Sequence, residues 1–149
     1  VAMIFDTWGS LLNDEQYEKF SLRYINKIKN AIVNKNIPLI YYVRETGRKL
    51  EALKNLDIDV LGIDSTTDIG VIKKEIGDKF ALQGNLDVNI LKKDESDIIA
   101  AIKNILISYG SNSGHIFNLG TGITPDINPD KVKMLIDNLA DISSKFHVK

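Results

Sequence analysis

The sequence contains no cysteine, three prolines, two histidines and one tryptophan among its 149 residues. The lack of cysteine excludes disulfides and thiolate metal sites, and it leaves the redox compartment undetermined. Basic and acidic residues nearly balance, 19 against 20, so no excess of positive charge predicts nucleic-acid binding. The apolar runs are short, and the longest, such as residues 37–43, cannot span a bilayer.

Catalytic and metal-binding motifs are also absent. The sequence has no Walker motif, no HExxH motif and no Ser-His-Asp spacing. His115 and His147 lie too far apart to predict a metal pair, and both are interpreted as structural or exposed residues. The chain begins inside an apolar run at Val1, without a charged and apolar leader. We therefore expect a cytoplasmic protein with no nucleic-acid or membrane partner, and the start at Val1 favours a truncated chain.

Five short apolar runs alternate with segments of helical periodicity. The runs are rich in β-branched and aromatic residues, which is typical of strands buried on both faces of a parallel sheet. The predicted strands are residues 2–6, 38–43, 60–63, 80–83 and 115–119. A strand and a helix recur roughly every 30 residues, which predicts right-handed βαβ crossovers in an α/β domain.

Apolar residues recur at helical spacing in four segments, residues 17–32, 50–56, 98–109 and 132–139. Local signals mark where helices start and end. Asn128 before Pro129 is typical of an N-cap followed by a proline in the first turn, and Asp94 is a weaker cap candidate. Gly77 and Gly110 are typical of residues that end a helix.

Polar residues follow each predicted strand at its carboxyl end. Parallel α/β proteins build their sites at this edge of the sheet. The residues are Asp6, Thr7, Arg44, Glu45, Asp64, Asn85, Asp87, Asn118 and Thr121. Taken singly, Asp64, Asp87 and Arg44 are interpreted first as loop and helix-cap residues. Their convergence at one edge predicts a site, but it names no reaction.

Two glycines flank Thr121 where the last predicted strand ends. Gly120 and Gly122 permit unusual backbone dihedrals and the close approach of a ligand or a second backbone. Trp8, after the first strand, either lines a pocket or covers the rim of the sheet, and both interpretations stay open. Residues 110–114 are interpreted as a plain loop, since they match no phosphate-binding fingerprint.

Five stretches share their order and spacing with one known family. They are IFDTWGSLL (4–12), FSLRYINKI (20–28), VLGIDSTTDI (60–69), DKFALQGNLD (78–87) and GHIFNLGTGITPD (114–126). Together they resemble the C-terminal portion of the uroporphyrinogen decarboxylase family. The resemblance implies a TIM (β/α)8 barrel, of which this chain forms about five strands with the N-terminal portion missing.

The family's activity follows from the same resemblance. It implies decarboxylation of the four acetate side chains of uroporphyrinogen III, which gives coproporphyrinogen III in haem biosynthesis. The reaction is cofactor-free in the family and needs no metal. The full-length proteins commonly form homodimers, so the implied partners are the substrate uroporphyrinogen and a second copy.

The resemblance places two residues of this chain in the substrate cleft. Thr7 stands where the family has a serine or threonine whose hydroxyl faces the substrate. Thr121 stands where the family motif NLGHGI has a histidine, and threonine cannot supply the charge or reach of an imidazolium. Ser65 replaces a family tryptophan, and the lysine–glycine pattern near Arg44 and Glu45 is altered. The family's substrate aspartate, arginine-rich loop and cleft tyrosine belong to the missing portion, so no catalytic residue is assigned.

We expect residues 1–149 to be a single-domain piece of this enzyme that is inactive alone, because five strands cannot close an eight-stranded barrel. Two alternatives stay open. A methyltransferase of the same superfamily would bind zinc through cysteine and histidine, which the absence of cysteine disfavours. A freestanding, non-enzymatic α/β binding domain with an open sheet has the same periodicity as five strands of a barrel.

Overall fold

The computed structural model describes residues 1–32, 36–76, 78–111 and 113–146. Five strands form one parallel sheet in the order β1-β2-β3-β4-β5, which is also their order along the chain. Their bounds are β1 Ala2–Asp6, β2 Leu39–Val43, β3 Val60–Gly62, β4 Ala81–Leu86 and β5 His115–Leu119. The predicted α/β class with five parallel strands is confirmed.

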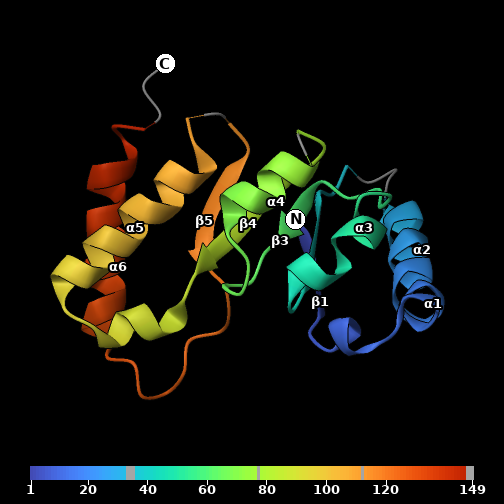
Figure 1. The fold of residues 1–149 in the computed structure, drawn as a ribbon, viewed down its shortest axis with the longest axis horizontal. Helices are drawn as coiled ribbons and strands as arrows, with labels where there is room; N and C mark the ends of the chain where they lie inside the picture. Colours follow the sequence, from blue (N-terminus) through green and yellow to red (C-terminus); the bar gives the residue numbers. More distant parts are fainter. Residues whose placement is uncertain (33–35, 77, 112, 147–149) are drawn as a thin grey trace.

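The helical segments follow one another around the sheet in chain order, from α1 and α2 at the right of Figure 1 to α6 at the left. The α-helices are α1 Asp14–Tyr17, α2 Arg23–Ile32, α3 Leu50–Leu53, α4 Ile69–Ile76, α5 Glu95–Tyr109 and α6 Pro129–Ser143, and a π-helical turn, η2 Glu18–Leu22, joins α1 to α2. Short 3-10 turns are η1 Gly9–Leu11, η4 Thr46–Lys49 and η5 Val88–Lys92. Within the described ranges, no helix is long and apolar enough to cross a membrane.

The predicted helix signals have mixed outcomes. The Asn128 side chain accepts a hydrogen bond from the Asp130 backbone N–H at 2.9 Å, and Pro129 opens α6, so this cap is confirmed. Gly110 ends α5 with φ +89°, a conformation that glycine adopts without steric cost. Asp94 occupies the N-cap position of α5, but its side chain makes no capping hydrogen bond. Gly77 lies outside the described residues.

Two elements differ from the sequence prediction. No apolar pattern was predicted for α4, which is short and begins after the polar residues 64–68. Strand β4 extends to Leu86 instead of residue 83, because β5 pairs with it as far as Leu86 and Leu119. Gly84 allows this extension, since a Cβ at that position would collide with the Ile63 carbonyl. Gly84 and Asn85 are residue types typical of a turn, so the sequence predicts a strand end there, although both residues lie inside β4.

The sequential strand order determines where the helices lie. Doubly wound sheets reverse their strand order at a switch point, and this sheet has no reversal. Right-handed crossovers in one direction place all connecting helices on the same face of the sheet.

The packing agrees with this arrangement. One core packs the helix-side face of β2 and β3 against α2, α3 and α4 through Ile25, Tyr41, Leu53, Leu61 and Ile72. A second core packs β4 and β5 against α5 and α6 through Leu86, Ile98, Ile102, Leu119 and Leu135. The opposite face is partly bare, since Phe5 of β1 is 67% exposed and Ile116 of β5 is 42% exposed.

A partly buried ion pair connects the helix layer to the start of β2. The Lys29 ammonium of α2, which is almost fully buried, donates to Asp59 Oδ2 at 2.6 Å. The same oxygen accepts the Leu39 backbone N–H at 2.7 Å. These two hydrogen bonds, together with the positive charge of Lys29, hold the pKa of the Asp59 carboxyl below its ordinary value of 3.8.

We predict that Asp59→Asn lowers the free energy of unfolding by about 1–2 kcal/mol near neutral pH, because it leaves the Lys29 ammonium buried without its counterion. The value is moderate because half-exposed Asp59 is screened by solvent. A depressed carboxyl pKa stabilises the fold above that pKa range, and the contribution is lost on acidification below about pH 4. Urea unfolding at pH 7 and pH 3 measures both effects.

Asp57→Asn is the matched control, because Asp57 is an exposed carboxylate two residues away with no partner among the described residues. The control is expected to leave the unfolding free energy unchanged. Equal effects of the two variants would contradict a specific role of the Asp59 pair.

Candidate functional site

A cavity of about 750 Å³ lies on the bare face of the sheet, toward the carboxyl ends of the strands. Its lining comes from β1 to β5 and from the loop after β5, and includes Met3, Phe5, Thr7, Tyr42, Arg44, Gly62, Gln83, Asn118, Thr121, Ile123 and Thr124. Thr7 and Thr121, which are 114 positions apart in the chain, both line it. The sheet therefore brings the two predicted site residues together.

Apolar side chains form the floor of this cavity. Residues that alternate along a strand point to the same face, so Met3, Phe5 and Thr7 line it together. The Phe5 ring lies 6.0 Å from the Tyr42 ring, centroid to centroid, at an interplanar angle of 57°. Because Phe5 remains largely exposed, its face is free to contact a flat apolar group in the cavity.

The loop that carries Thr121 is fixed by contacts on both sides. The Tyr42 hydroxyl donates to the Gly120 carbonyl at 3.0 Å, and the Gly120 N–H donates to the Leu86 carbonyl at 2.7 Å. A Cβ on Gly120 would collide with the Ser65 backbone nitrogen, so close packing requires glycine there. At Gly122 a Cβ would meet no described atom within 4 Å, so this glycine faces open space.

Tyr42 bridges strand β2 and the loop after β5, and its hydroxyl is a neutral donor. Partial burial raises the pKa of this hydroxyl, and the Asp64 carboxylate adds to the effect. The Arg44 guanidinium opposes the shift. Sequence analysis did not single out Tyr42. The alternation of side chains could have identified it: parallel pairing sets Phe5 opposite Tyr42, and both then lie on the same face of the sheet as Thr7.

The loop that carries Thr7 is held from the opposite face of β1. Asp6 Oδ2 accepts a hydrogen bond from the Tyr41 hydroxyl at 2.8 Å, and the Tyr17 hydroxyl lies 2.6 Å from that of Tyr41. Burial raises the pKa of both tyrosines far above the physiological range, so both stay neutral. Since Tyr41 donates to Asp6, Tyr17 donates to Tyr41. The carboxylate thus points to the helix layer, and the next residue, Thr7, lines the cavity.

Most other strand-end residues serve the loops. Asp64 accepts the backbone N–H groups of Glu45 and Thr46 at 2.9 and 3.3 Å. Asn85 donates to the carbonyl of Asp64 at 3.0 Å. Asp87 caps the 3-10 turn η5. The loop and cap interpretation is confirmed for Asp64 and Asp87, and these residues do not line the cavity.

Arg44 does not serve as a loop or cap residue, so this interpretation is wrong for it. Its guanidinium makes no hydrogen bond or ion pair with the described residues, and it lines the cavity. It lies 6.0 Å from the centroid of the Trp8 ring. Trp8 is 65% exposed and is not among the described lining residues, so it packs beside the rim rather than inside. Asn118 lines the cavity as predicted for the end of the fifth strand.

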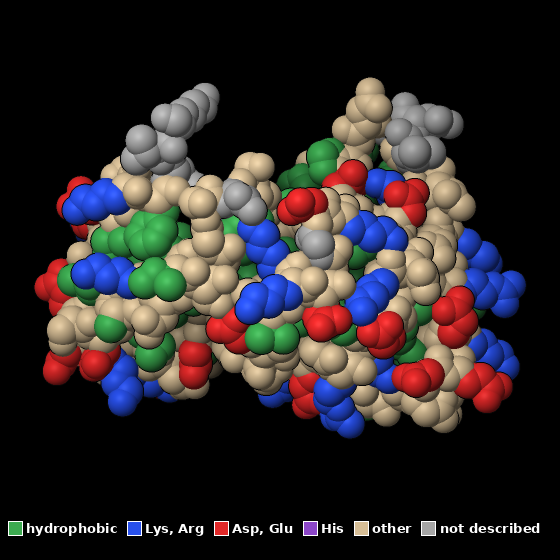
Figure 2. Space-filling model, turned by 45° about the horizontal axis from the view of Figure 1, so that its top comes forward, with side chains coloured by type: hydrophobic (Ala, Val, Ile, Leu, Met, Phe, Trp, Pro, Cys, Tyr) green, Lys and Arg blue, Asp and Glu red, His purple; other side chains and the backbone are tan. Residues whose placement is uncertain are grey.

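The described residues contain no group of three histidine, aspartate or glutamate side chains placed to hold a metal ion. His115 is half-buried, stacks on the Tyr109 ring at 4.4 Å, and places Nε2 3.0 Å from the Gly84 carbonyl, which confirms a structural position. His147 lies outside the described residues, as does Asn112 within the 110–114 loop. Figure 2 shows Lys and Arg interspersed with Asp and Glu over the face on view, without a patch of one sign.

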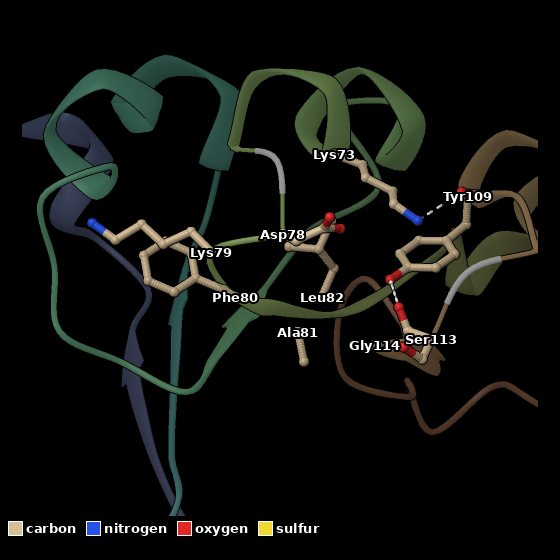
Figure 3. Close-up of a pocket in the computed structure, with 9 residues that line it drawn as sticks. All are labelled: Lys73, Asp78, Lys79, Phe80, Ala81, Leu82, Tyr109, Ser113 and Gly114. Atoms are coloured by element: carbon tan, nitrogen blue, oxygen red, sulfur yellow. Dashed lines mark hydrogen bonds between the residues drawn. The ribbon is translucent and has the colours of Figure 1, made fainter.

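A second cavity, of about 450 Å³, lies at the opposite end of the sheet, where β4 and β5 begin. Figure 3 shows the Lys73 amine directed toward Tyr109, while the Lys79 side chain extends away from them. The Lys73 amine donates to the Tyr109 carbonyl at 3.3 Å and lies 3.7 Å from its ring centroid. The Lys79 amine is bound to the Lys54 carbonyl. Both cations are thus engaged by the protein, and this end of a parallel sheet is not where sites form.

Comparison with known proteins bears on the first cavity. The family model described as uroporphyrinogen decarboxylase matches residues 1–142. The chain is 43% identical to the uroporphyrinogen decarboxylase of Methylococcus capsulatus over 149 residues, covering 98% of this chain and 43% of the relative. For the uroporphyrinogen decarboxylase of Tolumonas auensis the identity is 42%, with 98% of this chain and 42% of the relative covered.

One solved structure supports the fold. A methyltransferase from Methanosarcina mazei superposes with a TM-score of 0.79, covering 95% of this chain and 42% of the other at 18% identity. At this identity the likeness concerns the fold alone. The chain spans less than half the length of these relatives. The family match over nearly the whole chain shows that it belongs to the uroporphyrinogen decarboxylase family.

Proposed function

We propose that this chain, completed by the rest of a (β/α)8 barrel, decarboxylates the four acetate side chains of uroporphyrinogen III to give coproporphyrinogen III. The observation that carries the proposal is the meeting of Thr7 and Thr121 on one cavity. These are the two residues that the family motifs place in the substrate cleft. The names of the relatives point to the same substrate.

The lining chemistry supports a carboxylate-bearing pyrrole as ligand. Phe5 and Tyr42 offer aromatic surface to a flat ring. The hydroxyls of Thr7 and Thr121 can each donate a hydrogen bond to a carboxylate, and Arg44 brings a positive charge. A hydrogen bond to a charged partner contributes about 1.5–3 kcal/mol.

The chemistry of the reaction indicates which tasks fall to the residues of this chain that line the cavity. In each step the bond between the methylene carbon and the carboxyl carbon breaks, carbon dioxide leaves, and a proton adds to the methylene carbon. The pyrrole ring can accept the electron pair only while it carries an added proton on a ring carbon, and it loses that proton once the methyl group has formed. Among the described residues that line the cavity there is no carboxylic acid or histidine. These residues therefore bind and orient the substrate, and we expect the proton donor from the rest of the barrel.

The proposal includes the domain organisation. The chain matches about two fifths of its relatives, and residues 1–149 are proposed to form one part of a larger barrel. A cytoplasmic location and a homodimeric full-length protein follow from the family resemblance and stay predictions.

A second candidate function is that of a non-enzymatic binding domain with an open sheet. One observation favours it, because both apolar cores and the cavity are already formed within this chain.

We predict that the purified 149-residue chain releases no coproporphyrinogen from uroporphyrinogen. A fusion to the N-terminal portion of the Methylococcus capsulatus relative is expected to restore the activity, because 43% identity preserves most packing partners. Chromatographic separation of the products measures both, with the complete relative as positive control. Turnover by the chain alone would contradict the need for the rest of the barrel. An inactive but folded fusion, beside an active control, would contradict the proposed function.

We predict that Thr121→His in the completed barrel raises kcat/KM by about ten- to a thousandfold, the range of orientation effects in catalysis. The exposed Thr121 side chain and the open space at Gly122 leave room for an imidazole. Steady-state kinetics measure the change, and circular dichroism checks the fold.

Thr7→Val tests the second predicted substrate residue, because it keeps the side-chain shape and removes the hydroxyl. It is expected to raise KM with little loss of stability. If Thr121→His leaves turnover unchanged while Thr121→Ala lowers the unfolding free energy, Thr121 only supports its turn and is not a substrate residue.

A further inference from the structure

The charge distribution in the cavity is concentrated on one residue. Among the described residues that line it, Arg44 is the only charged one. The rest of the lining is apolar or carries neutral hydroxyl and amide groups. A ligand that enters this space therefore meets one positive charge among uncharged side chains.

The local structure keeps that charge unpaired. Glu45 follows Arg44 directly, but it adopts a left-handed backbone conformation with φ +53°. This conformation is uncommon for glutamate and directs its side chain to Arg48, whose guanidinium lies 2.5 Å from Glu45 Oε2. The Asp64 carboxylate is also occupied, since it accepts hydrogen bonds from Glu45, Thr46 and Thr66. Both nearby carboxylates are thus bound elsewhere.

The guanidinium is also oriented before a ligand arrives. It lies over the Trp8 ring, with its central carbon 6.0 Å from the ring centroid. At this distance the ring attracts the guanidinium by a cation–π interaction, and the N–H edge stays available for a bidentate contact with a carboxylate. Thr7 and Arg44 each follow the registered pair Asp6 and Val43 by one residue, so a hydroxyl and a guanidinium stand at neighbouring strand ends.

From this geometry we infer that Arg44, oriented by Trp8, is the specificity-determining residue that binds a carboxylate of the substrate in this cavity. The inference rests on the proposed function for the identity of the substrate, whose ring carries acetate and propionate groups. Arg44 binds one of these carboxylates through its N–H fork, and Thr7 donates to the same group. The pyrrole ring then lies against Phe5 and Tyr42.

The test uses uroporphyrin I, a stable oxidised tetrapyrrole with eight carboxylates, and measures its fluorescence anisotropy on titration with the 149-residue chain. Arg44→Gln is expected to raise the Kd at least tenfold, because it removes both the charge and the fork. Arg44→Lys keeps the charge alone and is expected to raise the Kd about threefold.

Arg23→Gln is the matched control. It removes the same charge from an exposed side chain of α2 that does not line the cavity, and it is expected to leave the Kd unchanged. Circular dichroism confirms that each variant is folded.

Equal affinities of the wild-type and Arg44→Gln chains would overturn the inference while leaving the proposed function standing. Equal losses of affinity in Arg44→Gln and Arg23→Gln would also overturn it, because the effect would then come from the net charge of the chain alone. If the wild-type chain does not bind uroporphyrin I, the inference fails, and turnover by the completed barrel then decides independently whether the proposed function fails with it.

Discussion

The strand order is the constraint on which the rest of this structure depends. Five parallel strands succeed one another without a reversal, so right-handed crossovers place every connecting helix on the same face. That face is buried under two apolar cores. The other face is left with aromatic and apolar side chains in contact with solvent, as the exposure of Phe5 shows. Curvature of the sheet around this bare face into a barrel would bury those side chains, and this is the arrangement proposed for the completed protein.

The site follows from the same constraint. Alternation along β1 turns Asp6 toward the helices and Thr7 toward the cavity, and two buried tyrosine hydroxyls hold the Asp6 carboxylate in place. On the far side, Tyr42 reaches from β2 to the Gly120 carbonyl and fixes the loop that carries Thr121. The cavity is therefore shaped by hydrogen bonds that originate on both faces of the sheet. Its chemistry is simple: flat apolar surface, neutral donors and a single guanidinium.

The sequence predicted the parts of this arrangement that depend on local pattern. Strands β1 and β5 were predicted at their observed bounds, because their apolar runs end in clear turn signals. The α6 cap was predicted for the same reason. Thr7 and Thr121 were found through their motifs, and the fold brings both to one cavity.

The remaining features depend on contacts between distant segments. Strand β4 continues through Gly84 because β5 pairs with it, which no local rule indicates. Tyr42 became a site residue only once the register of β1 and β2 was known, and Arg44, one of the predicted strand-end residues, was separated from the loop residues only by its place in the cavity. Arg44 in particular looks like a loop cation in the sequence, since its isolation from Glu45 depends on one left-handed residue and on Arg48.

Amide hydrogen exchange at the two edge strands tests the central claim most directly. In the described chain β1 and β5 each pair with one neighbour only. Adding the separate N-terminal portion of the Methylococcus capsulatus relative is predicted to slow exchange along the outer edges of both β1 and β5, because new strands would pair with both. Unchanged exchange at both edges, despite binding of the added portion, would contradict the account and identify the five-stranded sheet as a complete structure.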